Sequence, residues 1–504
     1  MKSSVPRNIL FGFLSFFLPL ISSFVVMPFV VRGMGAAEYG LYSLALGFIS
    51  YSFAFGLGRG VTKYIAEYQA AGDAQSIADI LAATIFISLL IGICGTLIFL
   101  VGARVFVTDV LLIKPEQADK AVNAFYLAAA TVIAIILQPV LSGVLQGLGR
   151  FDWYSHINTV FSTLLSVGNL ILVKLGGETI ALLWWNLIGV VASVVVLAWA
   201  TRRAMPELKL TFRFSRQSLR LATNFSGAVI VHQVSVNLWL LFERSWITRR
   251  FGTENLTFYL VPMTIATLII ALMLSFSLAL MPLASRVAAE QDGKRLISIY
   301  QRATKYVTLL VVFICVSLTV GGKAFLELWL GADFADRSYS ILIWHVLTWG
   351  MISFGLATWH INDGLGFPWR NACLAVVWSV CGIGLLIPLT SLYGLEGAAA
   401  ARTTTLFVSY PIFILVMEKL IFKQVFKKFW ATNLTAFALA GLAAGAIEYW
   451  LLEKLAVSWL TLTLAVAASG LVFFGTLILI RFFTPSELQW FKNFAARAMN
   501  RAGD

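Results

Sequence analysis

Arg32-Gly-Met-Gly-Ala-Ala-Glu-Tyr-Gly-Leu-Tyr42 joins two long apolar runs, and a related stretch returns in the second half of the chain. At residues 249–259 the chain reads Arg-Arg-Phe-Gly-Thr-Glu-Asn-Leu-Thr-Phe-Tyr, again between two apolar runs. A shift of 217 residues, the distance from Arg32 to Arg249, superimposes Gly35 on Gly252, Tyr42 on Tyr259, Gly149 on Gly366 and Gly177 on Gly394. Because these matches fall at corresponding ends of apolar runs, the sequence predicts two structurally similar halves with weak internal symmetry.

The composition is typical of a membrane protein. Hydrophobic residues make up 60% of the 504 residues and charged residues only 12%, which exceeds the apolar content that a soluble domain needs. The first apolar run is too long for the core of a signal peptide and has no small-residue cleavage site after it, so we expect a first membrane span there. The cysteines, Cys94, Cys315, Cys373 and Cys381, lie in apolar runs without metal-ligand spacing, and neither a disulfide nor a metal site is expected.

The membrane spans can be placed by length, because a helix needs about 20 apolar residues to cross a bilayer. Fourteen candidate segments occur, at residues 8–31, 40–58, 79–101, 121–145, 157–174, 179–200, 222–242, 256–282, 306–322, 338–361, 371–390, 396–417, 430–452 and 456–480. The last two have no counterpart in the repeat. The expected fold is an all-α polytopic membrane protein with two pseudo-symmetric six-helix bundles and two extra C-terminal helices.

The distribution of Lys and Arg sets the expected orientation and domain boundaries. With fourteen spans both ends of the chain lie on one side, and most Lys and Arg residues fall on that side, which predicts that both termini are cytoplasmic. This distribution accounts for the net charge of +13 without nucleic acid. We expect an N-terminal six-helix bundle at 1–200, a basic cytoplasmic linker at 201–221, a second six-helix bundle at 222–418, the extra helix pair at 430–480 and a cytoplasmic tail at 481–504.

One family has the same pattern at its N-terminus. The stretch Arg32–Tyr42, the next apolar run, the motif Gly58-Arg59-Gly60-Val61-Thr62-Lys63-Tyr64-Ile65-Ala66-Glu67-Tyr68 and then Gly72-Asp73 resemble bacterial polysaccharide exporters. These are the oligosaccharide-lipid flippases, such as O-antigen flippases, of the multidrug/oligosaccharidyl-lipid/polysaccharide flippase superfamily. The motifs cover about the first 80 residues, and the helix count covers the whole chain.

The resemblance implies a fold and a function. It implies two six-helix bundles that face each other across a central cavity, and alternating access of that cavity to the two sides of the bacterial inner membrane. The expected substrate is an oligosaccharide linked to polyprenyl pyrophosphate, flipped during surface polysaccharide or lipopolysaccharide biosynthesis. Membrane lipids, and a glycan polymerase and glycosyltransferases of the same pathway, are the partners that it suggests; no cofactor is expected.

Polar side chains follow one face of several predicted spans. In the seventh span Ser226, Gln233, Asn237 and Arg244 share a face, and the same holds for Asn8, Ser15 and Ser22 in the first span and for His156, Thr159, Thr163, Ser166 and Asn169 in the fifth. Polar stripes in lipid usually face the protein interior or a wet cavity. We expect His156, Asn169, Gln233 and Asn237 to contact the substrate. For the Ser and Thr residues, hydrogen bonding between helices remains the alternative.

Three arginines are candidates for binding the pyrophosphate. An anion of this kind needs cations along its route through lipid, and Arg can hold phosphate oxygens through two parallel hydrogen bonds. We expect Arg59 and Arg150 to collect the headgroup on the cytoplasmic side and Arg244 to meet it deeper in the membrane. Two alternatives stay open: the cytoplasmic cations could be topological anchors, and a local ion pair with Glu243 could account for Arg244.

No enzyme signature is found in the sequence. Paired-carboxylate, zinc-protease, nucleophile-elbow and Walker motifs are all absent, so the chain is not expected to be an enzyme. A drug or small-molecule exporter of the same superfamily, coupled to cations, should carry acidic residues inside the N-terminal spans, and none lies mid-span there. A membrane glycan polymerase or ligase should carry a large outer loop with catalytic residues, whereas the longest outer loop predicted here is about 102–120.

Overall fold

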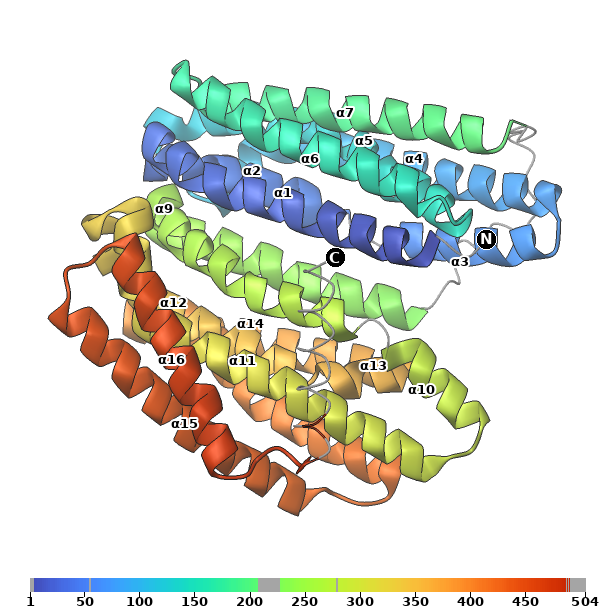
Figure 1. The fold of residues 1–504 in the computed structure, drawn as a ribbon. Coiled ribbons are helices and arrows are strands. Elements are labelled where there is room, and N and C mark those ends of the chain that lie inside the picture. Colours follow the sequence, from blue (N-terminus) through green and yellow to red (C-terminus); the bar gives the residue numbers. More distant parts are fainter. Residues whose placement is uncertain are drawn as a thin grey trace, which may run out of the picture. The chain divides into compact units, whose positions relative to one another are not determined.

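Long helices make up the regular structure of the protein in this computed structural model (Figure 1). The structure describes residues 4–53, 56–206, 227–277 and 280–485, together with Glu487 and Gln489, and no strand occurs in them. In chain order the helices are α1 (Ser4–Met34), α2 (Ala36–Ser52), α3 (Leu57–Ala70), α4 (Ala74–Val105), the π-helix η1 (Phe106–Val110), α5 (Pro115–Gly147), α6 (Phe151–Lys174), α7 (Thr179–Ala204), α9 (Gly227–Ser277), α10 (Leu280–Ala289), α11 (Gly293–Leu330), α12 (Ala332–Phe354), α13 (Leu356–Gly364), α14 (Pro368–Phe422), α15 (Lys427–Lys454) and α16 (Trp459–Leu479).

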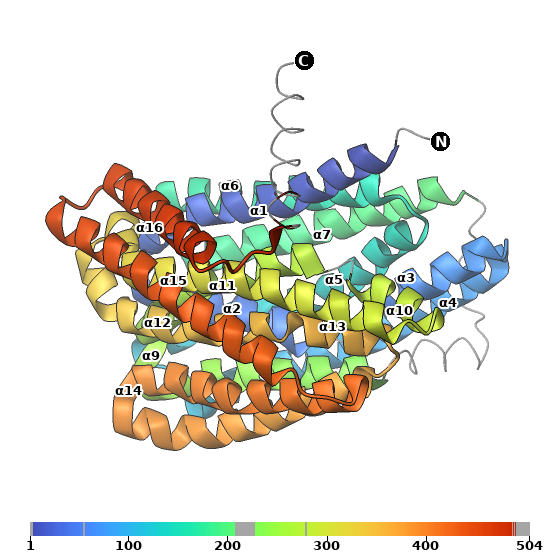
Figure 2. The ribbon, with the colours of Figure 1, turned by 60° about the horizontal axis from the view of Figure 1, so that its bottom comes forward.

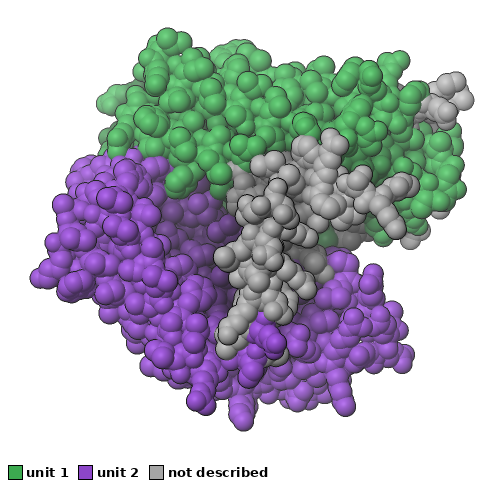
Figure 3. Space-filling model, in the orientation of Figure 1, with its two compact units in different colours: residues 1–260, 368–401 green, residues 261–367, 402–504 purple. Residues whose placement is uncertain are grey.

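Two compact units divide the chain (Figure 3). The first unit comprises residues 1–260 and 368–401, and the second comprises residues 261–367 and 402–504. The division passes through α9 and through α14, so each of these helices contributes one segment to each unit. All the predicted substrate-binding residues therefore belong to the first unit.

The helices account for the predicted number of spans. Within the described residues, ten helices are long and apolar enough to cross a membrane. Two of them are broken in the middle, α9 at Gly252 (φ 84°) and α14 at Gly394 (φ 59°), so each supplies two spans. The apolar part of α1 and the bent pair α2–α3 supply the other two. The predicted all-α fold with fourteen spans is confirmed, and the protein is a multi-pass membrane protein.

The predicted internal repeat is visible in the backbone. Gly35, just before α2, has φ 81° and ψ 159°, and Gly252 has φ 84° and ψ 172°. This region of φ and ψ is open to glycine and strained for other residues. Asp73 and Asp292 cap α4 and α11 in the same way, each accepting a hydrogen bond from the backbone N–H three residues later, at 3.0 and 2.9 Å. The two halves therefore interrupt their helices at corresponding points with similar geometry.

The glycine-rich motif of the sequence forms most of α3 and allows it to pack closely on α5. A Cβ atom on Gly58 would lie 2.3 Å from the carbonyl oxygen of Pro139, so only glycine fits at this crossing. One turn later, Val61 and Ile65 are buried in a hydrophobic cluster that also includes α4 and α5. Arg59 is not part of this cluster and is exposed.

The extra helix pair, α15 and α16, packs on α11 within the second unit (Figure 2). Alanine side chains on α15 (Ala436, Ala440 and Ala444) are buried together with Phe473 of α16 and Leu309 of α11. Small residues let helix backbones approach closely in a membrane, where packing replaces the hydrophobic effect as the force between helices. The pair is therefore an integral part of the second unit.

Several sequence predictions fall outside the described residues. These are Ser226, the basic linker from residue 207 onward and the tail beyond Gln489, together with the side chains of Asn8 and Ser15.

Candidate functional site

The first segment of α9, from Gly227 to the break at Gly252, is fixed in the first unit by the first segment of α14. Three contacts follow one another along the two helices: Ser379 Oγ donates to the Ser235 carbonyl at 3.0 Å, Trp239 lies against Gly382, and Trp246 Nε1 donates to Thr390 Oγ1 at 2.9 Å. These contacts set the rotation of α9 about its own axis. They therefore decide where its remaining polar side chains point.

Arg244 leaves α9 on the side of α2 and is only 8% exposed. Its Nη1 donates to the backbone carbonyl of Ser43 at 2.9 Å, and its guanidinium carbon lies 5.0 Å from the centre of the Tyr51 ring. Gly47 lies one turn after Ser43, and a Cβ atom there would be 2.3 Å from Nη1. Because Gly47 has no side chain, the Ser43 carbonyl is open to the guanidinium, and α2 is shaped to receive Arg244.

Glu243, the neighbour of Arg244, has other partners. Its Oε1 accepts hydrogen bonds from the Tyr259 hydroxyl at 2.7 Å and from Trp239 Nε1 at 3.2 Å, and its side chain is 1% exposed. Throughout the part of the chain that the structure describes, no carboxylate lies within ion-pair distance of Arg244. A local ion pair with Glu243 is therefore not the reason for a buried Arg244.

A buried guanidinium without a carboxylate is costly in a membrane helix. Insertion scales give up to about 3 kcal/mol for an Arg at the helix centre. The Ser43 carbonyl and the Tyr51 ring offset part of this, since a desolvated cation–π contact contributes about 2 kcal/mol. Nε of Arg244 has no hydrogen-bond partner. An anion would complete the site, because a guanidinium presents five N–H donors and holds phosphate or carboxylate oxygens in pairs.

Gln233 and Asn237 lie one turn apart on α9 and contact each other. Gln233 Nε2 donates to Asn237 Oδ1 at 3.0 Å. Asn237 is 6% exposed, and Gln233 is half-buried. These two residues thus share a face of α9, as their spacing predicts.

Asn169 belongs to a second polar cluster, which joins α2, α6 and α7. Nδ2 of Asn169 and Nδ2 of Asn186 both donate to the Tyr42 hydroxyl, each at 3.0 Å. Oδ1 of Asn169 is buried without a partner. Buried polar atoms are nearly always hydrogen-bonded, so this free acceptor is a place where a hydroxyl-bearing ligand could bind.

Arg150 and His156 lie at the surface, around the start of α6. Arg150 Nε is 3.4 Å from the Asp152 carboxylate, and its guanidinium lies 4.5 Å from the centre of the Trp153 ring. His156 is exposed, with Nδ1 2.7 Å from the Asp152 carbonyl oxygen. Both side chains already have partners, which is the arrangement expected of residues that anchor a helix end at the membrane surface.

Arg59 lies beside the start of α9. The first turn of α3 approaches α9 closely, since a Cβ atom on Gly56 would be 3.7 Å from Val229. Arg59 lies in this turn, and its backbone N–H donates to the Gly56 carbonyl at 3.1 Å. One predicted cation therefore flanks the beginning of the first α9 segment, and a second, Arg244, lies further along it.

Sequence reasoning missed the surface of α2 that receives Arg244. A signal was present, because Gly40, Ser43 and Gly47 are spaced as a small-residue face on which another helix packs. A Cβ atom on Gly40 would lie 1.8 Å from the Thr253 carbonyl oxygen of α9. This close approach brings the Ser43 carbonyl within reach of Arg244.

The sequence matches one family over more than half of its length. A family described as "Polysaccharide biosynthesis protein" matches residues 5–288. The chain belongs to this family. Membership of the polysaccharide exporter group, expected from the motifs near the N-terminus, is thereby confirmed.

Named relatives and solved structures agree with this assignment. A Shigella flexneri protein named "Putative O-antigen transporter" is 22% identical over 405 residues, which covers 79% of this chain and 93% of the relative. An inward-facing multidrug resistance MATE family transporter of the MOP superfamily aligns with a TM-score of 0.69 at 18% identity, covering 81% of this chain and 94% of that one. An outward-facing transporter of this kind aligns with a TM-score of 0.62 at 19% identity, over 82% of this chain and 95% of the other.

At these identities the solved structures show the fold alone. The chain is a polysaccharide biosynthesis family member with the fold of MOP superfamily transporters. These relatives are named as transporters, which agrees with the expectation that the protein is not an enzyme.

Proposed function

We propose that this protein flips an oligosaccharide linked to polyprenyl pyrophosphate from the cytoplasmic to the outer leaflet of the bacterial inner membrane. It does so by alternating access, and no covalent bond changes. The family assignment and the relative named as an O-antigen transporter support the substrate class.

The observation that carries the proposal is the state of Arg244. It is more than nine-tenths buried, has no carboxylate partner among the described residues and keeps an unsatisfied Nε. An ionisable residue that is kept inside a membrane helix at such a cost is a functional candidate by default. A pyrophosphate is the anion that the proposed substrate would bring to it.

The remaining predicted residues take complementary roles in this proposal. Gln233 and Asn237 offer amide groups to sugar hydroxyls, and Asn169 offers its free Oδ1. Arg59 collects the headgroup at the cytoplasmic side. Arg150 and His156 also belong to the collecting surface. There the substrate headgroup competes with Asp152 for contacts to these two side chains.

The decisive experiment compares two arginines of the same helix. Arg244→Ala, in cells that depend on this protein for surface polysaccharide, should reduce export at least tenfold at equal protein level. Arg249→Ala is the control, because Arg249 is exposed and its Nη1 contacts the carbonyls of Asp109 and Val110. Export at the wild-type level in Arg244→Ala would remove this residue from the substrate route.

Water access to α9 provides a second test. In a variant that lacks the four native cysteines, Gln233→Cys and Asn237→Cys should each react with a water-soluble thiol reagent. If neither position reacts, these residues pack against protein and do not face a wet route.

The proposed orientation can be tested separately. A reporter fused after Asp504 should report a cytoplasmic location. A periplasmic readout would contradict an inner-membrane topology with both ends inside.

A second candidate function, export of a cationic drug, is favoured by one observation. Glu243 is a buried carboxylate in the first unit, and an exporter of cations needs such a group. Since Glu243 already accepts two hydrogen bonds, we expect Glu243→Gln to leave drug susceptibility unchanged. Increased susceptibility with normal polysaccharide export would favour the drug exporter.

A further inference from the structure

A basic pocket lies in the second unit, and its lining includes none of the residues assigned above. It has a volume of about 1040 Å³ and is bordered by α11, the start of α15 and the segment that follows α16. Lys305, Lys427, Lys428 and Arg481 line it, and none of the described lining residues is acidic. Positive charge therefore predominates over the described part of the lining.

Three of these cations are free to bind a ligand. Lys427, Lys428 and Arg481 are exposed, and their side chains make no ion pair or hydrogen bond within the described residues. Lys305 differs, because its Nζ is paired with the Glu487 carboxylate at 3.0 Å. Like charges that border one pocket repel one another, and an anion between them relieves this repulsion.

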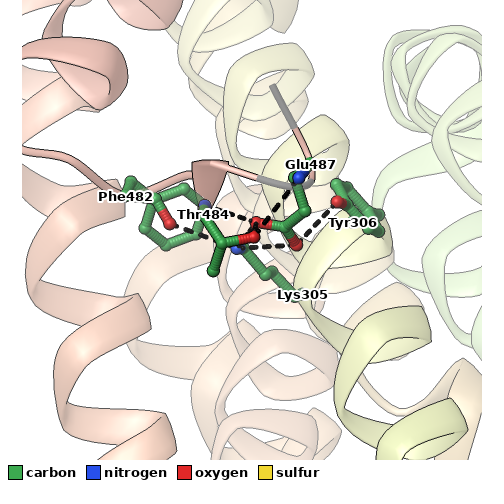
Figure 4. Close-up of polar contacts among 5 residues, drawn as sticks. All are labelled: Lys305, Tyr306, Phe482, Thr484 and Glu487. Atoms are coloured by element: carbon green, nitrogen blue, oxygen red, sulfur yellow. Dashed lines mark hydrogen bonds and ion pairs between the residues drawn. The ribbon is translucent and has the colours of Figure 1, made fainter. Parts of the chain in front are cut away.

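One wall of the pocket is held in place by Glu487 (Figure 4). Lys305 donates to the Phe482 carbonyl at 3.1 Å and to both oxygens of Glu487, which also accepts from the Tyr306 hydroxyl at 2.8 Å. Thr484 and Glu487 form a reciprocal capping box, with Thr484 N–H to Glu487 Oε2 at 2.7 Å and Glu487 N–H to Thr484 Oγ1 at 3.3 Å. The chain around Arg481 is thereby fixed against α11.

The opposite wall is held by another carboxylate, which is buried. Glu418 is 1% exposed and accepts hydrogen bonds from the Tyr300 hydroxyl at 2.8 Å, from the Phe426 N–H at 2.9 Å and from Trp430 Nε1 at 2.7 Å. Phe426 and Trp430 bracket the first turn of α15, where Lys427 and Lys428 lie. Both cationic walls are thus tied to one stretch of α11, so the pocket is preorganised, and little conformational entropy is lost when a ligand binds.

The other part of the pocket combines an apolar strip with uncharged polar side chains. Phe429, Ala436 and Leu439 of α15 and Ile480 contribute to its lining, and Leu439 and Ile480 are 52% and 41% exposed. This apolar strip leads from the cations along the side of α15, which is a membrane-spanning helix. A ligand that fills both parts has an anionic head and a hydrocarbon tail.

We propose that this pocket binds an anionic phospholipid of the leaflet in which α15 begins and α16 ends. Basic pockets between membrane helices bind anionic lipid headgroups. A soluble anion would leave the apolar strip unused, and a zwitterionic lipid would leave the three cations without net compensation. The bound lipid joins α11 to the extra helix pair, and this role is independent of the substrate that the first unit handles.

Binding can be measured on the purified full-length protein with dioleoyl phosphatidylglycerol, dioleoyl phosphatidylcholine and sodium phosphate as probes. Native mass spectrometry and thermal unfolding should show retention of phosphatidylglycerol and stabilisation by it, and neither for the other two probes. Each Lys or Arg near a lipid surface strengthens such binding about fivefold, so Lys427→Gln/Lys428→Gln/Arg481→Gln should weaken it roughly hundredfold.

The matched control is Lys114→Gln/Lys174→Gln/Lys454→Gln, which removes the same charge from exposed positions that do not line the pocket. It should bind phosphatidylglycerol like the wild type, and so should Arg244→Ala. If the triple pocket variant does not fold, Arg481→Gln alone should weaken binding about fivefold. Equal binding of both lipids, an equal effect of free phosphate or unchanged affinity in the pocket variants would each overturn the proposal.

Discussion

The two halves of the chain interrupt their helices in the same way but differ in the side chains beside the interruption. Gly35 and Gly252 share a backbone conformation that is strained for any other residue. The shift that relates these glycines places Arg244 on Met27 and Glu243 on Val26 of α1. Val26 is 7% exposed and lies in an apolar cluster, whereas Glu243 and Arg244 are charged residues at the corresponding depth. The interruption therefore belongs to the fold, and the buried charge is an addition to one half.

The two added charges are not equivalent. Glu243 is satisfied by Tyr259 and Trp239, and its role can be explained by packing alone. Arg244 has one carbonyl, one aromatic ring and an unsatisfied Nε. The comparison thus separates a charge that the protein itself compensates from a charge that keeps an unsatisfied donor, for which we propose an external anion as the partner.

The largest effect on export is expected when Arg244 is replaced by methionine, the residue type at the corresponding position, Met27, of the first half. Arg244→Met should lower export roughly ten- to hundredfold, because hydrogen bonds to a charged group contribute about 1.5–3 kcal/mol. Thermal stability should stay constant or rise, since an apolar side chain replaces an unpaired buried charge. Export assays and thermal unfolding of the purified protein measure the two effects, and Met27→Leu is the control. A large loss of stability with unchanged export would reverse the assignment.

Changes at the shared interruptions should affect folding. Gly252→Ala and Gly35→Ala should each destabilise the protein by about 1–3 kcal/mol, because alanine is strained in this backbone conformation. A steric clash does not contribute, since a Cβ atom would meet no neighbour within 4 Å at either site. Gly384→Ala, in a helical position with equal space, should gain up to about 1 kcal/mol. Thermal unfolding in detergent would show the difference. Equal effects at all three positions would mean that the interruptions impose no special conformation.

A smaller effect on export is expected from a change in the α2 surface that receives Arg244. Gly47→Ala places a Cβ atom where Nη1 now lies, and the guanidinium has to move away from the Ser43 carbonyl. Because the end of an Arg side chain is flexible, we expect export to fall several-fold, less than in Arg244→Met. Gly102→Ala, with no neighbour within 4 Å, should export normally. Wild-type export in Gly47→Ala would show that the contact with α2 is not needed.

The smallest effect, on local stability, is expected in the segment that follows the extra helix pair, which the first half lacks. Burial raises the pKa of Glu487, but hydrogen bonds from the Thr484 N–H, Lys305, Tyr306 and the Thr484 hydroxyl outweigh it and lower this pKa to about 2. The resulting stabilisation is complete above the ordinary value of 4.5 and is lost as pH falls through about 2. The backbone amides of Phe482, Phe483, Thr484 and Glu487 should therefore exchange hydrogen equally slowly from pH 5 to pH 8, once intrinsic rates are divided out. Glu487→Gln should lose this protection at every pH, and a pH-dependent loss between 5 and 8 in the wild type would contradict the assignment.

Most of the fold could be predicted because hydropathy is a local property. The length of each apolar run sets the number of spans, and the spacing of Gly35 and Gly252 along the chain reveals the repeat. The shared face of Gln233 and Asn237 likewise follows from helical spacing, and their hydrogen bond agrees with it. Ser22 was expected in a polar stripe of the first span, with hydrogen bonding between helices as the alternative; it donates instead to the Pro19 carbonyl of its own helix.

The candidate site could be predicted only in part, because its partners come from distant segments. The carbonyl that holds Arg244 is 201 residues away in the sequence. The Arg150 side chain is chemically suited to bind phosphate. Its contacts with Asp152 and Trp153, however, depend on side-chain conformation, which the spacing of residues does not reveal. No periodic pattern connects α11 with the start of α15 and the segment after α16, so the basic pocket also requires the structure.

The amino-acid sequence by itself determined that this chain crosses the membrane with paired halves, and it predicted Arg244 just past the end of the span at 222–242, on the face of Gln233 and Asn237. Both follow from the cost of exposing backbone and charge to lipid, which acts on each segment separately. The tertiary structure decided that Glu243 is satisfied, that Arg244 is not, and that Glu418 and Glu487 hold the walls of a cationic pocket. These outcomes depend on which helix surfaces meet, because close packing brings together groups that are far apart along the chain.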